Sequence, residues 1–181
     1  MWRRLRWVLL ALVVALVAAA VTAVVVEKPT LDDDEQAVDA KWVPLRDSLK
    51  TRYDALGTAV SALDDAGEAK RSVTTALVAD LAAWKKALAA DDAHRQADVA
   101  NRLEGDGARL RANVGGSPRL SQIPAITGAV AGFDTAAPRP PVIDAYNRAV
   151  RTYEDDRTDT VRRVVALAFG FDERPLYTVP G

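Results

Sequence analysis

The residue types that usually carry out catalysis are scarce in this sequence. His94 is the only histidine, and there is no cysteine. A zinc site of the usual kind needs three or four histidine, cysteine or carboxylate ligands, and a serine triad needs a histidine as its base. His94 lies in a charged stretch at 91–98, which is typical of a solvated loop or a helix start, and no Gly-x-Ser-x-Gly elbow occurs. We therefore expect no catalytic residue, no metal site and no enzymatic activity.

Binding of nucleotides or nucleic acids is also a poor match. The Gly-Asp-Gly stretch at 105–107 lacks the preceding strand, the further glycine and the Lys-Ser/Thr ending of a phosphate loop. We expect no cofactor. Three of the 24 basic residues precede residue 7, and the other 21 are outnumbered by 25 acidic residues. Nucleic acid is not an expected partner, because phosphate binding needs a concentrated basic face.

Carboxylates are plentiful, and two groups of them invite a functional interpretation. Asp32, Asp33 and Asp34 could bind calcium, although acids at a helix N-terminus are the commoner explanation of such a run. Asp155 and Asp156 lie near arginines on one predicted helix, which favours surface ion pairs over acid–base catalysis. A metal-dependent enzyme that uses carboxylates alone is therefore an alternative to a protein without enzymatic activity.

Residues 7–26 form an unbroken apolar run in which Thr22 is the only polar residue. A helix of this length spans about 30 Å, the thickness of the hydrocarbon core of a bilayer. We therefore expect a retained transmembrane helix. A cleaved signal peptide that ends at Ala18-Ala19-Ala20 is the alternative, but the apolar run continues past Ala20. Because the flank at 1–6 is basic and acids follow the run, we expect a single-pass protein of the cell membrane, with a cytoplasmic N-terminus and an extracytoplasmic domain.

Apolar residues beyond a short juxtamembrane link at 27–31 recur every three or four positions, which is typical of amphipathic helices. Pro44 predicts a kink or a restart in the first helix, and the last helix is expected to run without a break from Ile143 to Ala168. Turn residues separate the stripes at 64–67, 91–92, 115–118 and 136–141. We expect an all-α fold, with an antiparallel bundle of about four helices over 32–171 and a C-terminal tail at 172–181.

The last helix resembles the closing signature of the LemA family, which runs Tyr-Asn-x-x-Val, a second Tyr-Asn, an Ala and Phe-Gly-Phe. This chain has Tyr153-Glu154 in place of the second Tyr-Asn. The matching positions are Tyr146, Asn147, Val150, Tyr153, Ala166, Phe169, Gly170 and Phe171. Upstream, Trp42, the Arg-x-Asp of Arg52 and Asp54, and Asn101 are similar to the family's earlier motifs. Gly57-Thr58 stands where the family has Pro-Asn, so the chain looks like a divergent member.

The resemblance implies a membrane-anchored helical bundle of undefined molecular function, with a membrane protease as one candidate partner. We therefore expect a non-enzymatic interaction or scaffold module of the bacterial cell envelope that offers a helical face or groove to another envelope protein. Self-association into a structural component is a further alternative. Within the signature, we expect Tyr146 to pack in the core and Asn147 to make a hydrogen bond between helices.

Overall fold

The chain folds into helices in the computed structural model, which describes residues 2–180, with side chains throughout from residue 25. The helices are α1 (Trp2–Asp65), α2 (Ser72–Ala89), α3 (Ala93–Gly115), α4 (Pro118–Ser121), α5 (Pro124–Thr135), α6 (Pro140–Thr158) and α7 (Arg162–Phe169). No strand occurs between residues 2 and 180. The all-α prediction is confirmed.

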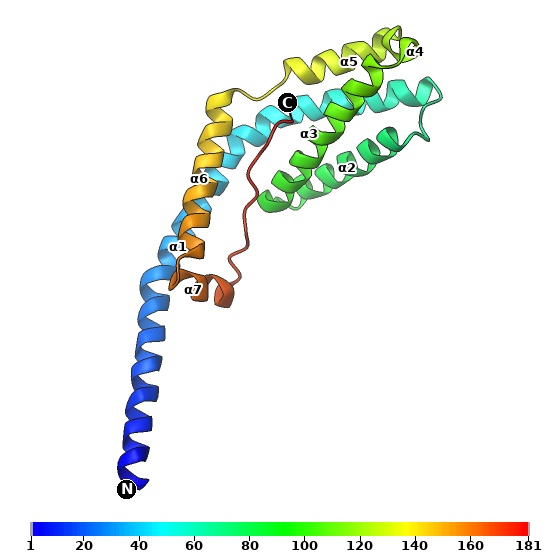
Figure 1. The fold of residues 1–181 in the computed structure, drawn as a ribbon. Coiled ribbons are helices and arrows are strands. Elements are labelled where there is room, and N and C mark those ends of the chain that lie inside the picture. The colour runs from blue at the N-terminus through cyan, green and yellow to red at the C-terminus, as the bar shows by residue number, and fades with distance from the viewer. Residues whose placement is uncertain (1, 181) are drawn as a thin grey trace.

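Helix α1 is the spine on which the other helices are assembled. It contacts α2, α3, α5, α6 and α7. Figure 1 shows α2 and α3 as a hairpin beside the cyan end of α1, while α5 and α6 run along α1 and its blue, N-terminal part projects beyond the bundle. The core is therefore built between one long helix and several shorter ones, as the predicted bundle requires.

The apolar run at 7–26 does not form a helix of its own. It is the first part of α1, which continues through the predicted link at 27–31, where Leu31 is fully buried. From Glu27 onward α1 carries many charged residues. Among the residues that the structure describes, no helix is long and apolar enough to cross a membrane. This finding contradicts the predicted transmembrane helix, the single-pass topology and the location in the cell membrane with an extracytoplasmic domain. The side chains of Arg3 and Arg4, which belong to the predicted basic flank, lie outside the residues whose side chains the structure describes.

Pro44 lies inside α1, which runs on to Asp65, so of the two predicted outcomes the restart does not occur and the kink is left. Figure 1 shows α1 bending along its length, as expected where proline removes an amide donor and crowds the preceding turn. The predicted single last helix is instead two helices, since Asp159 adopts an extended conformation with φ −55° and ψ 144° and its carboxylate accepts from the Val161 amide. The chain then turns and α7 packs against α1.

A buried polar cluster joins three of these helices inside the apolar core. Arg52 on α1 and Glu104 on α3 are 2 % and 1 % exposed and form two hydrogen bonds of 2.8 Å. The Arg52 guanidinium also donates to the carbonyl of Phe133 in α5 and lies 3.5 Å from the centroid of that ring. Burial alone would lower the pKa of Arg52, but Glu104 raises it above its ordinary value, so Arg52 stays charged. The pair fixes α1, α3 and α5 relative to one another.

The Phe133 ring also explains why α3 carries a glycine at residue 107. A Cβ built on Gly107 would lie 2.7 Å from Cε1 of Phe133, which is closer than carbon atoms approach.

We expect Gly107→Ala to lower the free energy of unfolding by about 1–3 kcal/mol, because Phe133 must move off Arg52. The matched control is Gly105→Ala in the same helix, where a Cβ meets nothing within 4 Å. This change should raise stability by about 0.5–1 kcal/mol. Urea denaturation of the two variants measures both changes in the free energy of unfolding. Equal changes for Gly107→Ala and Gly105→Ala would contradict the packing of Phe133 against α3.

Candidate functional site

The C-terminal tail, here residues 172–180, is an irregular segment bound along the helices. Gly170 ends α7 in the left-handed conformation, with φ 76°, which a glycine adopts at little cost. The tail then runs back between α6 and α3 toward the cyan, C-terminal part of α1 (Figure 1). We call the surface that receives it the tail groove, and define it by Asn101, Tyr146, Asn147, Tyr153 and Glu154.

Two asparagines hold the tail through its backbone. The Asn147 amide of α6 donates to the Tyr177 carbonyl and its oxygen accepts from the Tyr177 amide, both at 2.9 Å. Asn101 of α3 bonds the residues on either side of Tyr177. Its amide donates to the Leu176 carbonyl at 2.7 Å, and its oxygen accepts from the Thr178 amide at 2.9 Å. A carboxamide can supply both a donor and an acceptor in this way, which replaces the pairing that a neighbouring strand would give.

Three further side chains of α6 complete the contact with the tail backbone. The hydroxyls of Tyr146 and Tyr153 donate to the carbonyls of Pro175 and Asp172 at 2.8 Å. Burial raises the pKa of both phenols, so they are neutral donors at neutral pH. Glu154 accepts from the Arg174 amide at 2.7 Å. These hydrogen bonds and those of the two asparagines hold the backbone of residues 172–178, and their partners in the bundle are all side chains.

Arg174 is the first of two tail side chains that are themselves anchored. Its guanidinium lies 2.8 Å from Glu35 and 3.2 Å from Asp39, one turn apart on α1, and the side chain is 10 % exposed. Burial lowers the pKa of Arg174, but the two carboxylates more than compensate and hold it above its usual value. Burial raises the pKa of Asp39, and Arg174 opposes that shift.

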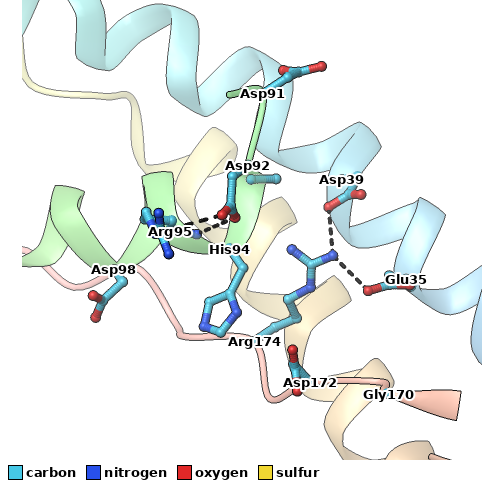
Figure 2. Close-up of a pocket in the computed structure, with 11 residues that line it drawn as sticks. Glu35, Asp39, Asp91, Asp92, His94, Arg95, Asp98, Gly170, Asp172 and Arg174 are labelled. Atoms are coloured by element: carbon cyan, nitrogen blue, oxygen red, sulfur yellow. Dashed lines mark hydrogen bonds and ion pairs between the residues drawn. The ribbon is translucent and has the colours of Figure 1, made fainter. Parts of the chain in front are cut away.

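A cleft of ≈ 560 Å³ opens beside Arg174, between α1, the start of α3 and the tail. Six carboxylates line it against the two guanidiniums of Arg95 and Arg174, an excess of four negative charges. Figure 2 shows Arg174 reaching from the tail toward Glu35 and Asp39, with His94 and Asp98 of α3 on the other side. The cleft is therefore an acidic environment suited to a cationic side chain, and Arg174 already extends into it.

Tyr177 is the second anchored side chain. Its ring is 1 % exposed and belongs to the same core as Tyr53 and Leu103. Burial and then the Glu104 carboxylate raise the pKa of Tyr177, which places its phenol in the field of the Arg52–Glu104 pair. The Tyr177 hydroxyl has no hydrogen-bond partner among the described residues. The buried pair thus underlies the tail groove where Tyr177 enters it.

Four of the twelve residues that carry the family resemblance contact the backbone of the tail. Asn101, Tyr146, Asn147 and Tyr153 bind its backbone, and Asn147 bonds the tail rather than another helix, which corrects the prediction for its side chain. The remaining members serve the fold or the surface. The ring centroids of Trp42 and Tyr146 lie 5.1 Å apart, and the Trp42 indole donates to Gln96. Arg52 is paired with Glu104, and Gly170 ends α7. Of the others, Val150, Ala166 and Phe171 are buried, whereas Asp54 and Phe169 are exposed.

Sequence reasoning missed the partners of these residues, above all Glu104, Arg174 and Tyr177. One signal was present. Arg52 fills a gap in the apolar stripe of the first helix, and a buried guanidinium requires a buried acid. The carboxylates at 32–34 were also misplaced, because they lie in the middle of α1 and not at a helix start, and Asp32 pairs with Lys28 at 2.6 Å. In the described part of the chain, no group of three or more His, Asp or Glu side chains is arranged to hold a metal ion.

No protein-family model and no curated protein matches this sequence.

The asparagine contacts predict a loss of stability that is specific to the tail groove. Asn147→Ala removes both bonds to Tyr177 and leaves two backbone groups unpaired, so the free energy of unfolding should fall by about 1–3 kcal/mol. Urea denaturation measures this loss, and chymotrypsin should cut faster after Tyr177. Asn113→Ala is the control, because Asn113 bonds only a carbonyl of its own helix. Its effect should stay within about 0.5 kcal/mol, and an equal loss in both variants would contradict the role given to Asn147.

Proposed function

We propose that this chain is a non-enzymatic interaction module that binds an extended segment of a partner protein in the tail groove. The observation that carries the proposal is the seven hydrogen bonds from side chains of α3 and α6 to the backbone of residues 172–178. Backbone contacts of this kind accept many sequences, because every peptide offers the same carbonyl and amide groups.

Three features support a receptor rather than a closed core. The bonds at Asn101 are exposed to solvent, and the tail residues at 172, 173, 176 and 178 keep exposed side chains. The tail leaves α7 at Gly170 and is connected to the bundle on that side, so it can leave the groove without a helix having to unwind. The acidic cleft beside the groove adds a charge preference.

The resemblance to the LemA family is part of the same proposal. Four of the residues that carry it, Asn101, Tyr146, Asn147 and Tyr153, are the ones that contact the tail backbone. A shared groove of this type gives those residue types a physical reason to occur together.

Site-specific photo-crosslinking in the cell of origin tests the interaction. A benzophenone amino acid replaces Arg151, an exposed residue of α6 beside tail residues 173–176, in the full-length chain. We expect discrete crosslinked proteins that disappear when Asn101→Ala and Asn147→Ala are added, because the groove then loses four backbone bonds. Lys85 on the exposed face of α2 is the matched control position, and it should not give the same products.

Two results would contradict the proposal. One is a set of products at Arg151 that is identical at Lys85 or unchanged in the double asparagine variant. The other is a reproducible hydrolytic or transfer activity of the purified chain that is lost when a specific residue is changed.

A further inference from the structure

The contacts of the tail show how the groove can select particular side chains in a bound segment, in addition to binding its main chain. The hydrogen bonds from the asparagines, the tyrosines and Glu154 go to main-chain atoms and carry no information about side chains. Arg174 is the charged side chain of residues 172–180 that packs against the bundle, at 10 % exposure, and Tyr177 is the aromatic one, at 1 %. Pro175 and Leu176 lie between them and are partly exposed, Leu176 at 37 %. The two anchors are three residues apart in an extended segment, a separation of roughly 10 Å.

The arginine anchor selects a cationic side chain. Glu35 and Asp39 lie one turn apart on α1, and a single nitrogen of the Arg174 guanidinium, Nη2, contacts both. The position therefore favours a long side chain with a positive charge at its end. The surrounding carboxylates at 91, 92, 98 and 172 disfavour an acidic residue at this position.

The tyrosine anchor selects an uncharged aromatic ring. Tyr177 is enclosed beside Glu104, so a phosphate on the ring would bring negative charge next to a buried carboxylate. The hydroxyl lacks a hydrogen-bond partner in the described part of the chain, which means that phenylalanine should fit at no loss.

We propose that the tail groove recognises extended segments in which an arginine precedes a tyrosine or phenylalanine by three residues, and that the chain's own tail competes for this site. This inference rests on the proposed function and adds the ligand chemistry to it. A tethered tail competes at an effective concentration in the millimolar range. A ligand supplied in trans can bind only the molecules whose groove is open. Its apparent affinity is therefore the intrinsic affinity multiplied by the fraction of open groove.

A fluorescent peptide with the sequence of residues 171–181 tests the proposal by anisotropy, using the full-length chain. Arg174→Ala in the protein weakens the hold of the tail and leaves every groove residue intact. We expect this variant to bind the peptide at least tenfold more tightly than the wild-type chain does. Arg174→Lys, which keeps the charge on a shorter side chain, should fall between the two.

Variants of the peptide separate sequence reading from backbone binding. Replacing its arginine by alanine, or phosphorylating its tyrosine, should weaken binding at least tenfold. Phenylalanine in place of the tyrosine should bind as well as the parent, and so should the Val179→Ala peptide, because Val179 is 46 % exposed. Adding Asn147→Ala to the protein should weaken all of these peptides alike.

Each opposite result has a distinct meaning. Equal binding of the parent and arginine-free peptides overturns the sequence preference but leaves the proposed interaction function standing. A folded Arg174→Ala chain that binds the peptide no better than wild type overturns the competition by the tail. If Arg174→Ala and Arg174→Lys both lose their helical circular dichroism at 25 °C, the tail is an obligatory part of the core and the proposal fails.

Discussion

The ion pair between Arg52 and Glu104 is the contact on which the rest of the structure depends. Both side chains are almost fully buried, and removing either would leave an uncompensated charge at a cost of about 3–5 kcal/mol. The pair can persist only while α1 and α3 keep their present positions, and the contact of Arg52 with Phe133 extends this constraint to α5. Tyr53 reinforces it, since its hydroxyl lies 3.2 Å from Glu104 and 3.1 Å from the Ala100 carbonyl. This buried polar cluster therefore constrains how α1, α3 and α5 pack against one another.

This geometry explains how an irregular segment can be ordered without a helix or a sheet. Every backbone amide and carbonyl that leaves water needs a partner, and the tail finds its partners in side chains of α3 and α6. Asn101 and Asn147 lie on different helices, so both can hold the tail only while the two helices keep a fixed separation. Burial and the Glu104 carboxylate raise the pKa of Tyr177, so the Arg52–Glu104 pair lies near the place where Tyr177 enters the groove. The groove is thus a consequence of the buried pair and the two asparagines together.

The sequence predicts the helices well and their assembly less well. Spacings of three and four residues locate the stripes of α2, α3 and α6, since burial of one face leaves a direct periodic trace. The break at Asp159 left no such trace, because neither glycine nor proline marks it. The apolar run at 7–26 predicted a membrane span, but it is the start of a continuous α1, and no helix in the described residues could cross a membrane. The tail groove was beyond sequence reasoning because Asn101, Asn147 and Tyr177 meet only through tertiary packing.

Native-state hydrogen exchange gives the most direct test of the central claim that the tail is a separable ligand of a preformed groove. The informative amides are those of Arg174, Tyr177 and Thr178, which bond to groove side chains, and those of buried α1 residues such as Leu49 and Leu56. The account predicts that the tail amides are protected, yet exchange by a local opening whose free energy lies clearly below that of α1. Exchange of tail and α1 amides at one common free energy, equal to that of global unfolding, would contradict it.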